Sequence, residues 1–230
     1  MACDRAQFGE AGQGHPFELR KPLAKPTARR CATCGADVLA HARGEVDDAS
    51  FMSILNVTDD QTPSVVIAGE LALGSFNAAL RLAQEDPAVV VVNCAGTKLH
   101  DFLPQTRTVM EGFRATQRLL DLEWEDSAEW AERQLDGGVE EASALETLLD
   151  ALRWAKEQQQ QGKMVMVNCA QGRSRSATFA IALVMATRNL EVEEAYALVK
   201  EARPFIRPND GFLKQLHRWQ AKLKGLFPAE

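Results

Sequence analysis

The chain has 230 residues, 46% of them hydrophobic and 25% charged, which is the composition of an ordinary globular protein. Its formal net charge of −6 argues against a general nucleic-acid-binding protein. No apolar run approaches the ~20 residues of a membrane span, and five unevenly spread cysteines argue against a secreted disulfide framework. We therefore expect a cytoplasmic protein, with the nucleus left open, that binds neither nucleic acid nor membrane. The composition leaves the oligomeric state undetermined.

The first 60 residues are predicted to form a partly flexible N-terminal extension, with a small Cys-containing element as a candidate. Residues 1–30 hold six glycine and proline residues and few large apolar ones. The basic stretch 20–30 is interpreted as a solvated tail, and docking to an acidic partner such as a protein kinase is the alternative. Cys31 and Cys34 lack a second cysteine pair, so free or redox-sensitive thiols are favoured over half a zinc site. We expect no metal and no cofactor.

The rest of the chain, residues 61–230, alternates predicted strands and helices. Two short strands are expected within residues 63–73, around the turn at Ala68 and Gly69. A helix over residues 75–83 follows, with Ser75 as its N-cap. The β-branched run 88–92 predicts a strand that is buried on both faces, as in a parallel sheet. Residues 118–124 alternate loosely in hydrophobicity and predict another strand.

The alternation continues to the C-terminus. Residues 126–138 are polar and are interrupted by Gly137 and Gly138. Residues 140–158 predict an amphipathic helix, which Gly162 ends. An apolar strand over 164–168 and a buried helix over 177–185 flank a short loop, and further helices are expected over 198–205 and 211–223. This alternation predicts an α/β fold with a central, mostly parallel sheet flanked by helices.

Cys169 and Arg175 stand six positions apart in the loop between that strand and that helix. A helix that begins after such a loop directs free backbone N–H groups and the positive end of its dipole at the loop. That arrangement binds a dianion and favours ionisation of a nearby cysteine. A thiolate, a set of amides and an arginine fork are the groups needed to break a phosphate ester. The alternative is a buried structural thiol, which is how Cys94 is interpreted, because no arginine follows it at this spacing.

The segment from Cys169 to Ser176, with Gly172 and Ser174 inside it, resembles the signature loop of the dual-specificity protein phosphatases, within the protein tyrosine phosphatase superfamily. Residues 202–212 resemble the family's late turn between two helices. Residues 67–75 and 122–127 resemble its first strand pair and the strand that delivers its general acid. The resemblance covers residues 61–222. It implies a three-layer fold that hydrolyses phosphotyrosine and phosphoserine or phosphothreonine in proteins through a phosphocysteine intermediate.

The resemblance also implies a role for each residue of the loop. Cys169 is the expected nucleophile, and Arg175 is expected to hold two phosphoryl oxygens. Ser176 is expected to help release the thiolate when the phosphocysteine is hydrolysed. The expected phosphate-binding residues are Ala170, Gln171, Gly172, Arg173, Ser174 and Arg175.

The general acid is expected to be Asp126, because its strand and the following Ser127 resemble the family's pattern. Asp126 lies 43 residues before Cys169, which is farther than usual in the family, so an insertion over residues 128–138 has to be assumed. Asp136 stands nearer to the usual spacing and is the alternative acid.

Asn168 stands where the family normally has a histidine. An asparagine amide donates hydrogen bonds but carries no charge. We therefore predict a higher pKa of the Cys169 thiol, and slower turnover at acidic pH, than in a typical relative. Arg173 either adds a cation beside the loop or points to solvent. Arg207 and Asn209 are predicted to be structural rather than catalytic.

The favoured function is thus that of an enzyme acting on phosphoproteins, a protein kinase being one candidate substrate. Two other functions stay open. The first is a weakly active or inactive phosphatase-like module that binds phosphoproteins. This alternative stays open because Asn168 replaces the family's histidine and because two aspartates are candidates for the general acid. A redox enzyme that uses the loop for arsenate or sulfur transfer is disfavoured by the turn at residues 203–209.

Overall fold

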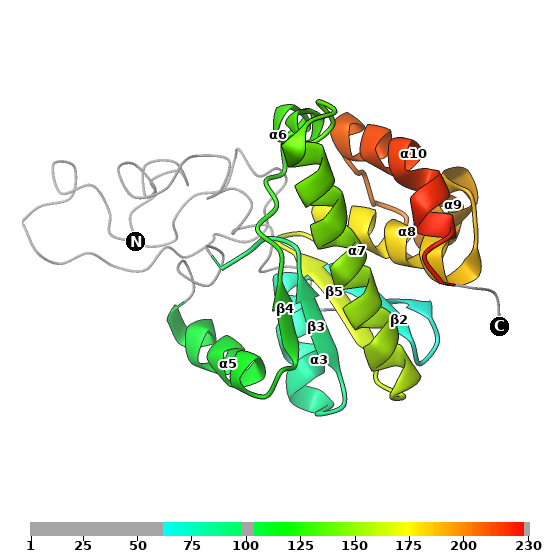
Figure 1. The fold of residues 1–230 in the computed structure, drawn as a ribbon. Helices are drawn as coiled ribbons and strands as arrows, with labels where there is room; N and C mark the ends of the chain where they lie inside the picture. Colours follow the sequence, from blue (N-terminus) through cyan, green and yellow to red (C-terminus); the bar gives the residue numbers. More distant parts are fainter. Residues whose placement is uncertain (1–61, 98–103, 228–230) are drawn as a thin grey trace, which may run out of the picture. The chain divides into compact units, whose positions relative to one another are not determined.

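A computed structural model describes residues 62–97 and 104–227, and the strands within them form one five-stranded sheet (Figure 1). Its order is β1-β2-β5-β3-β4, with β1 antiparallel to β2 and the remaining neighbours parallel. The mostly parallel sheet predicted from the sequence is confirmed. The strands are β1 (Ser64–Ile67), β2 (Leu71–Ser75), β3 (Val90–Asn93), β4 (Leu119–Asp121) and β5 (Val165–Cys169).

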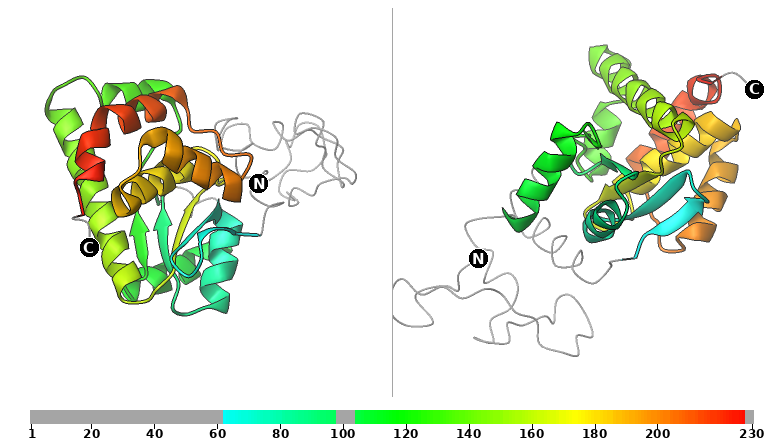
Figure 2. Two further views of the ribbon diagram at one scale, coloured as in Figure 1. Left: turned by 90° about the vertical axis from the view of Figure 1, so that its right-hand side faces the viewer. Right: turned by 90° about the horizontal axis from the view of Figure 1, so that it is seen from below.

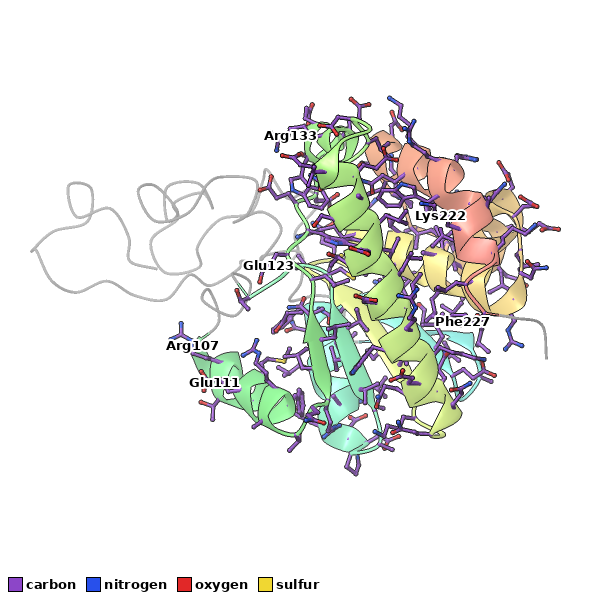
Figure 3. The ribbon with its side chains drawn as sticks, in the orientation of Figure 1. Arg107, Glu111, Glu123, Arg133, Lys222 and Phe227 are labelled. Carbon is purple, nitrogen blue, oxygen red and sulfur yellow. The ribbon has the colours of Figure 1, made fainter. Side chains whose placement is uncertain are left out.

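Helices cover both faces of the sheet, which lies between α7 and α3 in the left view of Figure 2. The helices are α3 (Phe76–Glu85), α5 (Pro104–Ala115), α6 (Ala128–Arg133), α7 (Val139–Gln160), α8 (Arg175–Arg188), α9 (Val192–Ala202) and α10 (Asp210–Lys224). Charged side chains such as Glu111, Arg133 and Lys222 project from the outer helical surfaces (Figure 3). The result is the three-layer α/β arrangement that the family resemblance implies.

The two faces of the sheet bury alternate residues of each central strand. Val165 and Val167 of β5 belong to one large apolar cluster together with residues of α7 and α8. Met166, on the opposite face, lies close to Gly74 and Ala78 at the start of α3. Because successive strand residues point to opposite faces, a strand buried on both faces must be apolar throughout. This explains why β3 and β5 are continuous apolar runs.

Helix α8 is the central helix of the domain. Its residues from Ser176 to Ala186 are all buried, which is why the sequence is apolar on every side rather than on one stripe. Helix α7 ends as predicted: the N–H of Gly162 donates to the carbonyl of Gln159, and that of Lys163 to the carbonyl of Gln158. Gly162 takes the left-handed conformation that this closing pattern requires, with φ of +74°.

Several expected elements differ in extent from the observed ones. The strand expected over residues 118–124 is shorter, because β4 ends at Asp121. The helix expected over 198–205 lies earlier: α9 begins at Val192 behind a capping box of Glu191 and Glu194 and ends at Ala202, since a residue before a proline avoids the helical conformation. Helix α6 lies within the polar segment 126–138, where no element was predicted.

The predictions for residues 1–60, including the basic stretch and the cysteines at 31 and 34, lie outside the described residues. Among the helices of the described ranges, none combines the length and the apolar character that crossing a bilayer takes. In the same part of the chain, no group of three or more His, Cys, Asp or Glu side chains is arranged to hold a metal ion.

Candidate active site

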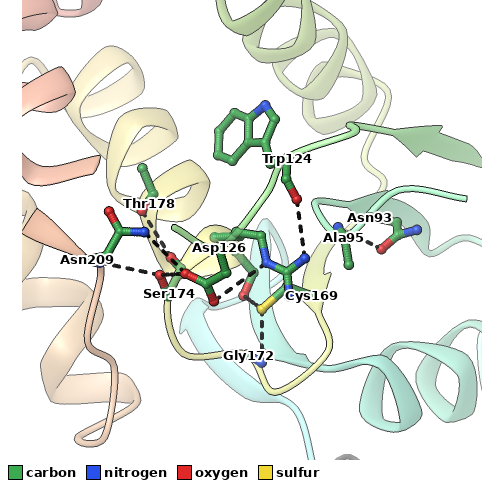
Figure 4. A network of polar contacts seen from close by, with 11 residues as sticks. Asn93, Ala95, Trp124, Asp126, Cys169, Gly172, Ser174, Thr178 and Asn209 are labelled. Carbon is green, nitrogen blue, oxygen red and sulfur yellow. Dashed lines mark hydrogen bonds and ion pairs between the residues drawn. The ribbon is translucent and has the colours of Figure 1, made fainter. Parts of the chain in front are cut away.

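Cys169 is the last residue of β5, and its sulfur accepts hydrogen bonds from the start of the next helix (Figure 4). The backbone N–H of Gly172 donates to Sγ at 3.3 Å, and the hydroxyl of Ser176 donates to it at 3.1 Å. Both donors belong to the loop and first turn that connect β5 to α8. The sulfur therefore lies at the amino end of a helix, where negative charge is stabilised.

The surroundings of Cys169 favour its thiolate. Burial opposes ionisation of this thiol, which is 2% exposed. Even so, the pKa of Cys169 is lowered, because the charge of Arg175 and the hydrogen bonds from Ser176 outweigh burial, while the charge of Asp126 acts in the opposite direction. The predicted nucleophile is thus a buried sulfur that its neighbours hold closer to the anionic state than a free cysteine.

Three carbonyls of the loop accept hydrogen bonds from the segment that follows α9. Arg203, only 1% exposed, donates from Nε to the carbonyl of Gly172 at 2.7 Å and from Nη2 to that of Gln171 at 3.1 Å. The N–H of Arg207 donates to the carbonyl of Arg173 at 2.8 Å. These three bonds fix the orientation of the peptide planes that follow Gln171, Gly172 and Arg173.

Gly172 has to be glycine for this loop to close. Its φ is +68°, a region that residues with a side chain rarely adopt. A Cβ at this position would lie 2.3 Å from the carbonyl carbon of Gly74 and 2.8 Å from Nη2 of Arg203. The obstacle to a side chain at this position is the neighbouring backbone of Gly74.

Arg175 extends across the loop toward the segment that follows β4. Its Nη1 donates to the carbonyl of Trp124 at 3.3 Å, and its Nε lies 3.6 Å from Oδ2 of Asp126. The side chain is only 13% exposed, and Nε is buried without a hydrogen-bond acceptor in the described part of the chain. Such a donor is costly to leave unpaired, and an anionic oxygen is the acceptor that suits it.

Asp126 lies at the same loop. Its Oδ1 accepts hydrogen bonds from the hydroxyl of Ser174 at 2.5 Å and from Nδ2 of Asn209 at 3.3 Å. Its side chain is 39% exposed, so the carboxyl group is open to solvent. Asp136 is exposed and accepts the N–H of Gly138 in its own turn at 2.9 Å. Of the two predicted acids, the structure brings Asp126 to Cys169 and Arg175.

Three further residues singled out from the sequence make contacts around the loop. Arg173 is exposed, and its Nε donates to the carbonyl of Phe205 at 3.3 Å, so it contacts the late turn. Asn209 caps α10 through its side chain, as a structural residue would, but the same side chain also donates to Asp126. Asn168 is buried and donates from Nδ2 to Oδ1 of Asn93 at 3.2 Å, linking β5 to β3.

Sequence reasoning assigned no role to Arg203, although the late turn that contains it was noted. The burial of Arg203, which marks it because arginine is almost never buried unless it is paired, becomes visible only in the structure. Cys94, interpreted from the sequence as a core residue, is fully buried, which confirms that interpretation.

Comparison with known proteins places this geometry in a family. The family model described as "Dual specificity phosphatase, catalytic domain" matches residues 90–222. The chain belongs to this family. Tyrosine-protein phosphatase pmp1 of Schizosaccharomyces pombe is 37% identical over 131 residues, which are 57% of this chain and 45% of that protein. Human dual specificity protein phosphatase 16 is 50% identical over 60 residues, 26% of this chain and 9% of the relative.

Solved structures of dual-specificity and related phosphatases share the fold. The crystal structure of DUSP15 covers 72% of this chain and 92% of its own, with 19% identity and a TM-score of 0.53. The PTP-2 phosphatase of Cydia pomonella covers 69% of this chain and 89% of its own, with 25% identity and a TM-score of 0.51. The chain spans less than half the length of the two curated relatives named above. Membership in the dual-specificity family therefore concerns the domain, and the activity of the whole protein is a separate question.

Proposed function

We propose that this protein hydrolyses phosphate monoesters on phosphotyrosine and on phosphoserine or phosphothreonine of proteins, through a phosphocysteine intermediate. The observation that supports this most strongly is the pairing of two groups. The sulfur of Cys169 accepts two hydrogen bonds at the amino end of α8, and the buried Nε of Arg175 has no hydrogen-bond acceptor in the described residues. A bound phosphate group would bring an electrophilic phosphorus to the first and an anionic oxygen to the second.

In the proposed reaction, the thiolate of Cys169 attacks phosphorus while the ester bond to the substrate oxygen breaks. Arg175 and the amides of residues 170–175 hold the non-reacting phosphoryl oxygens, whose charge they stabilise. Asp126 gives its proton to the leaving oxygen and then takes a proton from the water that attacks the phosphocysteine. Ser176, which donates to Sγ, stabilises the thiolate as it leaves in the second step.

The proposed substrates are phosphoproteins in a reducing, cytoplasmic compartment, and a protein kinase is one candidate among them. Two observations support the substrate class. Curated relatives are named tyrosine-protein and dual specificity protein phosphatases. Asp126, at 39% exposure, is open enough to reach the leaving oxygen of a phosphorylated side chain in a large substrate.

Hydrolysis of a small aryl phosphate by the full chain tests the proposal, with Cys169→Ser as the decisive variant. An alcohol is a far weaker nucleophile than a thiolate at neutral pH, so this variant should lose measurable turnover. Cys94→Ser makes the same chemical change at the other described cysteine and should keep activity. Turnover that survives in Cys169→Ser would refute the assignment of the nucleophile.

The alternative, a binding module, predicts a different outcome of the same experiment. Such a module would not hydrolyse the aryl phosphate at any pH from acidic to alkaline. It would still bind a fluorescent phosphopeptide, and Arg175→Ala would abolish that binding. Binding without turnover would therefore replace the proposed enzyme by a phosphoprotein-binding domain.

A further inference from the structure

A cavity lies between α6, α7, α8 and α10, outside the catalytic loop of residues 169–176. Its volume is about 210 Å³, and three of the four tryptophans of the chain line it: Trp124, Trp130 and Trp219. An apolar cavity of about 150 Å³ already holds a benzene molecule. This cavity therefore has room for one small aromatic ring system.

Contacts behind the three tryptophans hold the aromatic walls in place. The rings of Trp124 and Trp130 pack against the ring of Phe212, with centroids 5.6 and 6.1 Å apart, and Phe212 is fully buried. The indole N–H of Trp219 donates to Oε1 of Glu141 at 3.2 Å. Binding then costs little ordering of these side chains, and an aromatic guest gains ring–ring contacts in addition to burial.

One polar group on the wall of the cavity lacks a partner. Gln215 lines the cavity and is otherwise buried, with 5% of its surface exposed. Its Nε2 donates to the carbonyl of Ala131 at 2.8 Å, whereas its Oε1 accepts no hydrogen bond from the described residues. A buried amide oxygen is costly to leave unpaired. A guest with an N–H group would satisfy it.

The charges around the cavity disfavour an acidic guest. Of the described residues that line it, Glu123 alone is charged, and no Lys, Arg or His is among them. Oε1 of Glu123 accepts hydrogen bonds from the N–H and the hydroxyl of Thr97 at 2.8 and 2.9 Å, and both of these donors are neutral. An anion in the cavity would lose its water beside a carboxylate and without a cation to pair with. The cavity therefore suits a ring that carries no negative charge.

Two residues of the cavity wall also hold groups of the active site. The carbonyl of Trp124 accepts a hydrogen bond from Nη1 of Arg175 at 3.3 Å, while the indole of Trp124 points away from that hydrogen bond (Figure 4). The hydroxyl of Thr178 donates to the carbonyl of Ser174 at 3.0 Å, and the hydroxyl of Ser174 in turn donates to Asp126. A guest in the cavity thus touches the supports of both Arg175 and Asp126.

We infer that this cavity is a second binding site, which takes a small neutral aromatic molecule with an N–H donor and which is coupled to the phosphate site. A ligand shifts an equilibrium only toward the arrangement to which it binds better. An arrangement in which Trp124 moves away from Arg175 also takes its indole out of the cavity wall. The guest therefore stabilises the arrangement in which Arg175 is held, and it strengthens the binding of phosphate. The coupling, but not the site itself, rests on the proposed function.

The test is a titration of the full chain with indole, followed by saturation-transfer NMR of the small molecule. Two matched compounds keep the ring: 1-methylindole lacks the N–H, and indole-3-acetate adds a carboxylate. We expect indole to bind about five- to tenfold more tightly than either, because the first leaves Gln215 unpaired and the second buries a charge. Equal binding of the three compounds, or no saturation transfer from indole, would overturn the proposal.

Variants of α7 locate the bound indole. Ala144 lines the cavity and is half-buried, so Ala144→Phe should fill the cavity and abolish indole binding. Ala142→Phe adds the same ring at an exposed position two residues away, on another side of the helix, and should leave indole binding and aryl phosphate hydrolysis unchanged. Thr147→Phe blocks the cavity from an exposed lining position and replaces Ala144→Phe if that variant does not fold. Indole binding that persists in both blocking variants would contradict the site.

Inorganic phosphate distinguishes coupling from competition. Its presence should lower the Kd of indole by about fivefold or more, because coupling between two sites is reciprocal. A raised Kd would show that indole occupies the phosphate site, and an unchanged Kd would refute the coupling. If the protein fails to hydrolyse the aryl phosphate, the proposed function is wrong, whereas the comparison of the three indoles still decides whether the cavity is a binding site.

Discussion

The assignment of Asp126 as the general acid gives the sharpest prediction, because the chain supplies its own control in Asp136. We expect Asp126→Asn to lower kcat by ~10²–10⁴ for an ester with a weakly acidic leaving group, which corresponds to about 3–5 kcal/mol of transition-state stabilisation. Asp136→Asn, whose side chain accepts a hydrogen bond from Gly138 in its own turn, should leave kcat unchanged within a factor of about two, since it contacts none of the reacting groups.

The structure separates this catalytic loss from a loss of stability. An asparagine oxygen can still accept the hydrogen bonds that Ser174 and Asn209 donate to Oδ1 of Asp126. The lost ion pair with Arg175 involves a carboxylate that is 39% exposed, and solvent screening limits such a pair to about 1 kcal/mol or less. The free energy of unfolding, measured in urea, should therefore fall by no more than about 1 kcal/mol in this variant.

The assay is a series of aryl phosphates whose phenols differ in acidity. A strongly acidic phenol leaves without a proton, so Asp126→Asn should be nearly as fast as the unchanged protein on that ester and much slower on an ester of a weakly acidic phenol. A merely structural role of Asp126 would slow all esters equally. The reasoning is refuted if the loss does not depend on the phenol, or if Asp136→Asn shows the dependence and Asp126→Asn does not.

Four further variants test the loop. Gly172→Ala should lower the free energy of unfolding by about 2 kcal/mol or more in urea, because its Cβ would lie 2.3 Å from Gly74; an unchanged unfolding midpoint would contradict this. Arg203→Lys loses the fork that holds two loop carbonyls and should cost about 2–3 kcal/mol of stability together with most of kcat. Ser176→Ala removes a donor to Sγ and should raise the pKa of Cys169, so the onset of thiol alkylation moves to higher pH. Asn168→His should move that onset to lower pH; no shift, or a shift in the opposite direction, would contradict either prediction.

Elements of the fold were predictable where the hydrophobic pattern of a segment fits a single environment, such as burial on all sides. The Val-rich run of β3 and the apolar α8 are buried on all sides, so their hydrophobic character alone predicted their place in the core. Helix α6 was not predicted, because six residues, half of them charged, give too little periodicity. The start of α9 was missed as well, since its capping box uses Glu191 in place of the more usual serine or threonine.

The candidate site was predictable as far as it is local in sequence. Cys169, Arg175 and Ser176 lie in one loop, whose spacing is visible without a structure. The supports of that loop are distant: Arg203 lies about 30 residues later in the chain, and its hydrogen bonds to loop carbonyls depend on how α9 packs. The choice between Asp126 and Asp136 also needed three dimensions, because α6 (Ala128–Arg133) lies between the two residues and carries the chain away from the loop before Asp136 is reached.

The ionisation of the Cys169 thiol is tested most directly by measuring how the rate of its alkylation with iodoacetamide depends on pH. The alkylated product is followed on the tryptic peptide that spans residues 164–173. Below about pH 8.5, the value for a free cysteine, the rate should already have reached half its maximum, and inorganic phosphate should slow the reaction by occupying the loop. A half-maximal rate at or above that pH, with no protection by phosphate, would contradict the account of this protein as a cysteine-dependent phosphatase.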